Sequence, residues 1–336
     1  MAQIQDAVTT VFRPGLKRGL DACASPRGVF TVLALDHRQN LRREIRPEDP
    51  ASVSIDEMAE LKRDVVRGLA GHVSGVLLDP EFGAPRAIAD GSLPGSVGLI
   101  VAIEATGYDG SPTARRSRVL HGWSVGKAKR MGASAAKLLV YYHPDSSTAD
   151  EQERVVADVA DECRRFDIPL FLEPITYSVD VSKPTLTGED RRRVVIETAR
   201  RLTAIGGDVL KVEFPYDASV TEPARWAEAC KELDEVSPVP WVLLSGGVDD
   251  ATFERQVEVA CQAGASGVLV GRSVWAEATR LPATDRQRFL ATTSVDRLQR
   301  LVSAIEADGR AWHDRARALR DAAVGEGWYR DYPEAR

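Results

Sequence analysis

Cysteine is scarce in this sequence, and its four copies stand far apart without a C-x-x-C pair. This pattern suits free thiols in a reducing compartment better than a disulfide framework or a zinc site. No apolar run of about 18 residues occurs, and residues 1–21 lack the apolar core of a signal peptide. We therefore expect a cytoplasmic protein that has no membrane partner.

An excess of positive charge is also lacking, because the formal net charge is −6. This mild acidity argues against a dedicated nucleic-acid surface. Histidine is rare, with five copies and no H-x-H or H-E-x-x-H spacing, which disfavours a zinc-dependent mechanism. We expect no bound metal and no organic cofactor.

Eight short apolar runs, bounded by Gly, Pro or Asp, are the main structural signal. Their near-continuous apolar character is typical of strands covered on both faces, and amphipathic stretches lie between most of them. Eight βα units predict an α/β fold, a (β/α)₈ TIM barrel over about residues 29–280. A doubly wound sheet is the alternative, but no G-x-G-x-x-G follows the first run. The runs cover residues 29–36, 75–82, 98–104, 135–142, 169–177, 208–215, 240–247 and 266–273.

The ends of the chain exceed what a barrel needs. Residues 3–24 predict a helix across the barrel bottom, and residues 284–320 predict helix followed by a polar tail to 336. With no linker between them, we expect a single domain over residues 1–336.

Local signals place several helices. Ser54 with Glu57 and Thr148 with Glu151 have the spacing of capping boxes, and Asp250 is a candidate cap for the helix before residue 264. The Gly- and Pro-rich connection over 83–97 is too short for a full helix.

Charged residues interrupt several of the apolar runs. Lys211 and Glu213 share one face of their strand, and the apolar residues between them occupy the other, so Lys211 is expected to point into the barrel. Lys137 has the same kind of position two strands earlier, Glu173 lies on the strand between them, and Asp36 ends the first run. Alternate strands contribute to the same interior layer, which predicts that the two ammonium groups lie near each other.

Two interpretations of this cluster are open. The charges could form a buried ion network that only fills the barrel, although barrel fillers are mostly branched apolar residues. The other interpretation is an imine-forming lysine with carboxylates in reach, which gives a chemical reason for the cost of burying charge.

A second signal follows the last two strands. Ser245 and Gly246, then Gly271 and Arg272, supply small residues, backbone N–H groups and a bidentate cation where barrels commonly bind phosphate. His37 adjoins Asp36 and is expected to line the mouth of the same site.

The same residues carry a family resemblance from about residue 29 to 280. The blocks ALDHR (34–38), IEATGYDGS (103–111), GASAAKLLVYY (132–142), LFLEPITY (170–177), DVLKVEFP (208–215), WVLLSGGVDDATF (241–253) and GASGVLVGRSVWA (264–276) follow in order. Together they resemble the class I tagatose-1,6-bisphosphate aldolases and their relatives, the sulfofructose-phosphate aldolases.

The resemblance implies a role for each candidate residue. Lys211 would form the Schiff base, Glu173 would be the acid/base, and Lys137 and Asp36 would position the substrate. The phosphate would be held by Ser245, Gly246, Gly271 and Arg272. In one departure, His37 stands where the family has glutamine in a D-Q-R motif, which affects polar contacts to the substrate.

The expected activity is reversible cleavage of a ketose 1-phosphate to dihydroxyacetone phosphate and a three-carbon aldehyde. The expected partner is this small-molecule sugar phosphate, and we also expect a homo-oligomer. Two alternatives are another lysine-imine reaction, such as deoxyribose-phosphate cleavage, and a non-catalytic sugar-phosphate-sensing barrel that acts through a partner protein.

Overall fold

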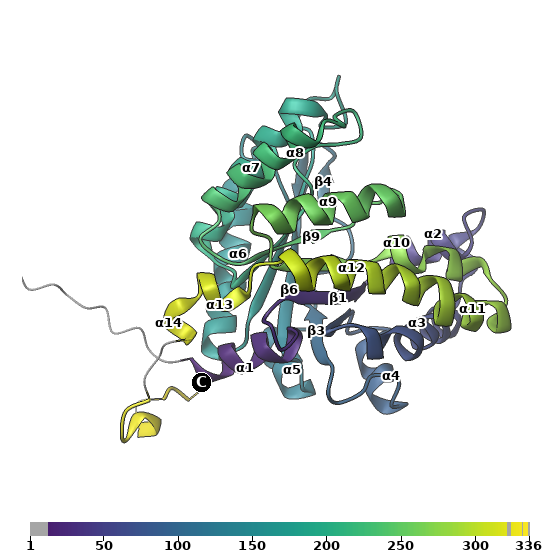
Figure 1. The fold of residues 1–336 in the computed structure, drawn as a ribbon, viewed down its shortest axis with the longest axis horizontal. Helices are drawn as coiled ribbons and strands as arrows, with labels where there is room; N and C mark the ends of the chain where they lie inside the picture. The colour runs from purple at the N-terminus through teal and green to yellow at the C-terminus, as the bar shows by residue number, and fades with distance from the viewer. Residues whose placement is uncertain (1–12, 321–323, 331, 335–336) are drawn as a thin grey trace, which may run out of the picture.

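Eight parallel strands close into a barrel in the computed structural model of the chain (Figure 1). The structure describes residues 13–320, 324–330 and 332–334. Each predicted run contains one barrel strand, so the predicted barrel is confirmed. Most strands are shorter than the runs, because the runs include residues of the loops that follow. In barrel order the strands are β1 (Phe30–Leu35), β2 (Gly75–Leu78), β3 (Gly98–Ala102), β6 (Ala135–Tyr142), β7 (Leu170–Thr176), β8 (Val209–Val212), β9 (Trp241–Leu244) and β10 (Gly267–Val270).

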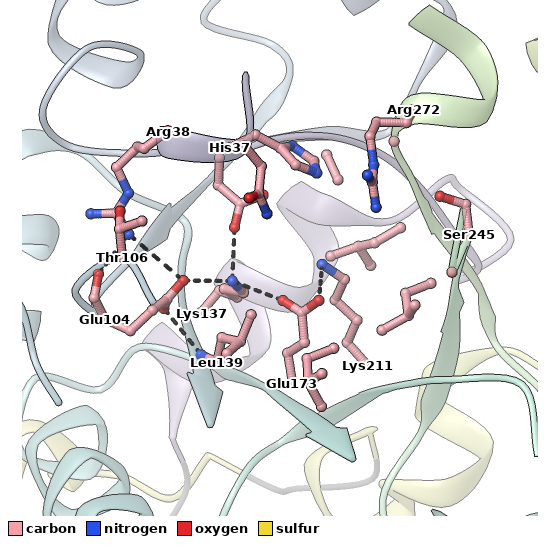
Figure 2. Close-up of a pocket in the computed structure, with 18 of the residues that line it drawn as sticks. His37, Arg38, Glu104, Thr106, Lys137, Leu139, Glu173, Lys211, Ser245 and Arg272 are labelled. Carbon is pink, nitrogen blue, oxygen red and sulfur yellow. Dashed lines mark hydrogen bonds and ion pairs between the residues drawn. The ribbon is translucent and has the colours of Figure 1, made fainter. Parts of the chain in front are cut away.

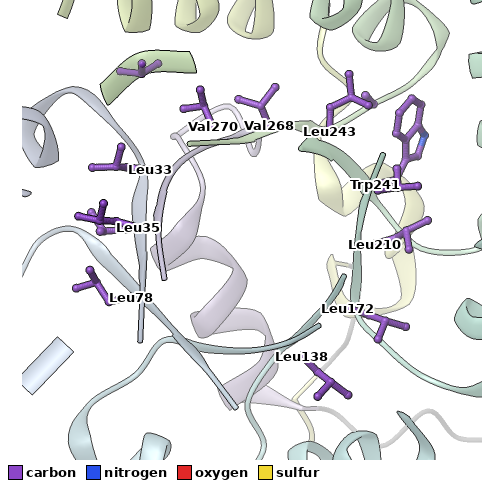
Figure 3. Packing of buried hydrophobic residues seen from close by; sticks show 14 of the residues in the cluster. Leu33, Leu35, Leu78, Leu138, Leu172, Leu210, Trp241, Leu243, Val268 and Val270 are labelled. Carbon is purple, nitrogen blue, oxygen red and sulfur yellow. The ribbon is translucent and has the colours of Figure 1, made fainter. Parts of the chain in front are cut away.

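Helices surround the barrel, and leucines and valines on the outer face of the strands pack against them (Figure 3). Burial of these side chains on the helix side supplies most of the apolar core. The connection over 83–97 holds only a six-residue helix, as expected. The main helices are α3 (Ile55–Leu69), α4 (Ala84–Ala89), α5 (Val125–Met131), α6 (Ala149–Arg165), α7 (Gly188–Ile205), α8 (Pro223–Val236), α9 (Asp250–Ala263) and α12 (Val295–Asp308).

Shorter elements decorate the loops and the C-terminal segment. The predicted helical stretch over 284–320 is confirmed, although it is divided into several pieces. The short elements are α2 (Gln39–Ile45), η1 (Pro50–Ser52), η2 (Ala70–His72), β4 (Asp109–Ser111), β5 (Ala114–Arg116), α10 (Arg272–Trp275), η3 (Ala276–Arg280), α11 (Ala283–Phe289), the π-helical turn η4 (Leu290–Ser294), α13 (Trp312–Arg315), α14 (Arg317–Arg320) and η5 (Trp328–Arg330).

The predicted helix starts have mixed outcomes. Ser54 and Glu57 form the full capping box of α3. The prediction for Thr148 is wrong, because its hydroxyl donates to the carbonyl of Arg115 and forms no cap bond with α6. The cap of α9 is Asp249, one residue before the predicted Asp250.

Helix α1 (Pro14–Cys23) plugs the bottom of the barrel (Figure 1). Its apolar residues cluster with side chains such as Phe30 and Phe171 inside the barrel and with Trp312 of the C-terminal segment. Gly19 permits this packing, since a Cβ there would lie 2.3 Å from the Ser134 carbonyl oxygen. The carboxylate of Asp167 accepts bonds from backbone N–H groups at the start of α1.

The predicted bottom helix is thus confirmed for residues 14–23, whereas the predicted part over 3–12 lies outside the described residues. The single-domain organisation of residues 1–336 stays a prediction. All four cysteines are buried and free, as expected of isolated thiols. No helix within the described part of the chain combines the length and apolar character that a membrane crossing requires.

Candidate active site

Side-chain alternation builds a layered barrel interior. Near the bottom, apolar residues such as Phe171 and Val209 fill the space above α1. Two residues further along the same strands come Glu173 and Lys211, and Lys137 follows Ala135 in the same way on β6. The interior therefore changes from apolar to charged toward the carboxyl ends of the strands, where TIM barrels place their active sites.

A pocket with a cavity volume of about 310 Å³ opens at this end of the barrel. Figure 2 shows that its side chains come from strands on both sides of the barrel. Every residue that the sequence nominated lines it, so the structure brings all of them together. These residues are Asp36, His37, Lys137, Glu173, Lys211, Glu213, Ser245, Gly246, Gly271 and Arg272.

The two buried lysines share one carboxylate. Glu173 places Oε1 at 2.7 Å from Nζ of Lys211 and Oε2 at 2.8 Å from Nζ of Lys137. The expected proximity of the two ammonium groups is therefore confirmed, with Glu173 between them (Figure 2).

The surroundings of the two lysines differ. Lys137 also contacts Asp36 at 2.7 Å and Glu104 at 2.6 Å, whereas Glu173 is the one carboxylate paired with Lys211 among the described residues. Burial alone would lower the pKa of Lys137, but its three carboxylate neighbours outweigh burial and raise that pKa well above its usual range. Lys137 is therefore a fixed cation, and the geometry leaves Lys211 as the better candidate nucleophile.

Asp36 and His37 join the cluster from the end of β1. Burial would raise the pKa of Asp36, but the charges of Lys137 and Lys211 reverse the effect and lower it. Burial, aided by the charges of Arg272 and Lys211, lowers the pKa of His37 to about 4 even though Asp36 opposes this. His37 is consequently neutral at pH 7, with its ring edge-on to Trp275 at 5.2 Å.

Sequence reasoning missed two residues of this site, Glu104 and Arg38. Glu104 holds Lys137 through one carboxylate oxygen and accepts the backbone N–H of Leu139 through the other. The guanidinium of Arg38 is buried, donating to Glu81 at 2.7 Å and to the Glu104 carbonyl at 2.7 Å. Glu104 continues the alternation of β3, and this signal could have identified it.

Glu213 does not pair with the amine of Lys211. The sequence pattern placed the two residues on one strand face, but the carboxylate paired with Lys211 is that of Glu173. Glu213 lies just after the end of β8 at Val212, and its side chain bonds residues of β7 and α7. Its carboxylate accepts the N–H and hydroxyl of Thr176, both at 2.7 Å, and pairs with Arg191 at 3.1 Å.

The far wall of the pocket consists of the turns after β9 and β10. Gly246 and Gly247 have φ angles of 58° and 83°, a region that favours glycine, and they bend the chain directly after Ser245. Gly271 precedes Arg272, whose guanidinium lies 3.4 Å from a carboxylate oxygen of Glu44. Side-chain exposure of 38% leaves the Arg272 guanidinium accessible from the pocket.

Within the described residues, no three His, Cys, Asp or Glu side chains are arranged to hold a metal ion. Metal and cofactor independence stay predictions. The buried lysine–carboxylate cluster at the carboxyl end of a TIM barrel is the arrangement that a class I aldolase needs.

Comparison with known proteins specifies the family. Residues 30–277 match the family model described as DeoC/LacD family aldolase, and the chain belongs to this family. It is 31% identical over 321 residues to the tagatose 1,6-diphosphate aldolase of Lactococcus lactis, an alignment that covers 89% of this chain and 98% of the relative. A tagatose 1,6-diphosphate aldolase 2 of Streptococcus agalactiae is 30% identical over the same shares.

Solved structures share the fold. A Schiff-base-forming fructose-1,6-bisphosphate aldolase superimposes with a TM-score of 0.55 at 23% identity, covering 85% of this chain and 98% of the other. A Corynebacterium glutamicum protein gives a TM-score of 0.61 at 18% identity, covering 87% and 92%.

Proposed function

We propose that this class I aldolase cleaves a ketose 1-phosphate reversibly to dihydroxyacetone phosphate and a three-carbon aldehyde. The observation that carries the proposal is the contact between Lys211 and Glu173, 2.7 Å apart and both less than 10% exposed. An amine beside a carboxylate, with a fixed cation on the other side, has the groups that imine chemistry needs. The tagatose-bisphosphate aldolases among the relatives support the substrate class.

In the proposed mechanism, the neutral amine of Lys211 attacks the C2 ketone, and loss of water gives a protonated imine. Glu173 accepts the proton of the C4 hydroxyl as the C3–C4 bond breaks. The electron pair of that bond moves to the imine nitrogen, which yields an enamine, and the aldehyde leaves. Protonation at C3 and hydrolysis then release dihydroxyacetone phosphate and restore Lys211.

The remaining residues hold the substrate in this proposal. Lys137, kept charged by its three carboxylates, stabilises negative charge on Glu173 and donates to substrate hydroxyls, whereas the Asp36 carboxylate accepts hydrogen bonds from them. The C1 phosphate occupies the wall made by Ser245, Gly246, Gly271 and Arg272. His37 and Glu213 contact the bound sugar from the rim.

Borohydride reduction in the presence of dihydroxyacetone phosphate tests the nucleophile. We expect one covalent adduct by intact mass, placed on Lys211 by a peptide map, and no adduct in Lys211→Met. An adduct on Lys137, or none, would contradict the assignment. Lys137→Met is the matched control, because it removes the other buried amine of the cluster.

Turnover assays separate the alternatives. Cleavage of a ketose 1-phosphate supports the proposal. Preferential cleavage of deoxyribose 5-phosphate would replace it with the other lysine-imine reaction, and tight sugar-phosphate binding without turnover would indicate a sensor. EDTA treatment should leave turnover unchanged. The expected homo-oligomer and the cytoplasmic location stay predictions.

A further inference from the structure

Three tyrosine rings surround one guanidinium beside the mouth of the barrel. The Cζ atom of Arg115, on β5, lies 4.6 Å from the ring centroid of Tyr108, 5.3 Å from that of Tyr141 and 4.7 Å from that of Tyr177. Each distance is within the range of cation–π attraction. The rings come from three separate parts of the chain, so the barrel fold assembles this cage around Arg115.

The cage holds Arg115 in place. Its Nε donates to the carbonyl of Pro112 at 3.0 Å, and its backbone N–H donates to the hydroxyl of Tyr177 at 3.2 Å. That hydroxyl in turn donates to Ser146 at 2.8 Å. A guanidinium fixed in this way loses little further freedom when it binds a ligand.

The charge of Arg115 has no carboxylate partner among the described residues. Its neighbour Arg116 differs, because Glu151 pairs with it at 2.8 Å. Arg118, two residues on, pairs with Asp109. The aromatic faces therefore position Arg115 but do not neutralise it, and both Nη groups keep their capacity to bind an anion.

The cage adjoins the end of the pocket that lies opposite the proposed phosphate wall. Tyr141 lines the pocket itself, as do Thr106 and Gly107, which directly precede Tyr108. Figure 2 shows Arg272 and Ser245 on one side of Lys211 and Thr106 on the other.

The hairpin of β4 and β5 is fixed to the barrel at this edge. The backbone N–H of Ala105 donates to the carbonyl of Arg118 at 2.8 Å, and that of Tyr141 donates to the hydroxyl of Ser117 at 2.8 Å. The cage therefore has a fixed place relative to the charged cluster.

We propose that Arg115 binds the terminal anion of the aldehyde half, a phosphate or a sulfonate at C6 of the ketose 1-phosphate. The inference rests on the proposed function, which puts C1 at Arg272 and C2 at Lys211 and so directs C6 toward Thr106 and Tyr141. Arg38 is the other cation near this end, but its guanidinium is already bound to Glu81 and to the Glu104 carbonyl. Arg115 thus selects for a doubly anionic substrate.

Three ketose 1-phosphates that end at C6 in a phosphate, a sulfonate or a hydroxyl test this role. In Arg115→Gln, kcat/KM should fall about 10- to 150-fold for the two doubly anionic substrates, because a charge-assisted bond is lost. For the C6-hydroxyl substrate it should stay at the wild-type value. The wild-type kcat/KM values for the phosphate and the sulfonate substrates are then compared, and the larger one identifies the anion that the site binds.

Three reference variants complete the experiment. Arg116→Gln, on the adjacent position of the same strand, should leave all three values unchanged. Arg115→Lys keeps the charge but loses the planar stacking, so its kcat/KM for the two doubly anionic substrates should lie between the values of the wild type and of Arg115→Gln. Arg272→Ala should lower all three values, because every substrate carries the C1 phosphate.

Equal losses on all three substrates in Arg115→Gln would overturn the inference and make the cage a structural support of the hairpin. Unchanged values would also overturn it. Borohydride trapping of dihydroxyacetone phosphate reports on the proposed function separately, since that compound has no C6 group. If the wild-type protein is trapped but Arg115→Gln does not discriminate among the three substrates, only the anion site is refuted. If the wild-type protein is not trapped with dihydroxyacetone phosphate, the underlying aldol mechanism is refuted.

Discussion

Replacing Glu173 by glutamine separates imine formation from bond cleavage. At 2.7 and 2.8 Å, and with an effective dielectric constant of about 20, the carboxylate attracts Lys211 and Lys137 by about 6 kcal/mol each before the cost of burial. Lys137 keeps Asp36 and Glu104 in the variant, so its charge remains compensated. Lys211 loses its paired carboxylate, so no ion pair has to be broken before the amine attacks the ketone.

Cleavage should respond in the opposite way. In the proposed mechanism the variant has no base for the C4 hydroxyl, and general acid–base groups typically contribute about 10²–10⁴-fold, or about 2.7–5.4 kcal/mol of transition-state free energy. We expect kcat, measured as release of dihydroxyacetone phosphate, to fall by this factor. Borohydride trapping on Lys211 should persist, and a circular-dichroism melt should show a folded protein.

Glu213→Gln is the matched control. Glu213 bonds Thr176 and Arg191 but neither buried lysine, so the substitution should lower the melting temperature and raise KM through the lost rim contact with the sugar, without the fall of about 10²–10⁴-fold in kcat. Near-normal turnover in Glu173→Gln, with Glu213→Gln folded but inactive, would reverse the two roles. Loss of trapping in Glu173→Gln would show instead that the carboxylate is needed before the imine forms.

Two further predictions concern residues beside the cluster. Lys62, on α3, pairs with the fully buried Asp79 and donates to the carbonyl of Leu35 at 2.8 Å. Lys62→Met should destabilise the protein by about 3–5 kcal/mol in urea unfolding, because Asp79 is left uncompensated, and Lys62→Met/Asp79→Asn should recover part of the loss. A change below about 1 kcal/mol would contradict this reasoning. Since the folded-state pKa of His37 is about 4 and the unfolded value about 6.5, the free energy of unfolding should decrease as pH falls through this window. His37→Gln should flatten that dependence, and an unchanged slope would show that another group causes it.

Much of the charged cluster could be predicted from strand alternation. Lys137, Glu173 and Lys211 each interrupt an apolar run, and the period of two assigns all of them to the barrel interior. Parallel strands of a barrel end at the same edge, which predicts that the turns after β9 and β10 line the pocket. The structure confirms this prediction.

Contacts that depend on where a strand ends could not be predicted in the same way. Glu213 was assigned by extending the alternation of β8 by one residue past its end at Val212. Its actual partner, Arg191, belongs to α7 and reaches it through helix packing, which no local pattern encodes. The Arg115 cage likewise joins residues from three segments, and the bond from Thr148 to Arg115 explains why the expected capping box is absent.

The plug formed by α1 also has a consequence for the order of events in turnover. With apolar side chains filling the barrel below Lys211, substrate and both products must pass through the same opening above it. In the proposed mechanism one product is still covalently attached when the other is free, so the aldehyde departs first and dihydroxyacetone phosphate last. In the synthetic direction the order of events is reversed. Dihydroxyacetone phosphate binds first, and the aldehyde then enters a pocket in which Lys211 already carries the enamine. The covalent imine therefore sets an obligatory order of release, and the plug makes both products use one opening, while every step stays reversible.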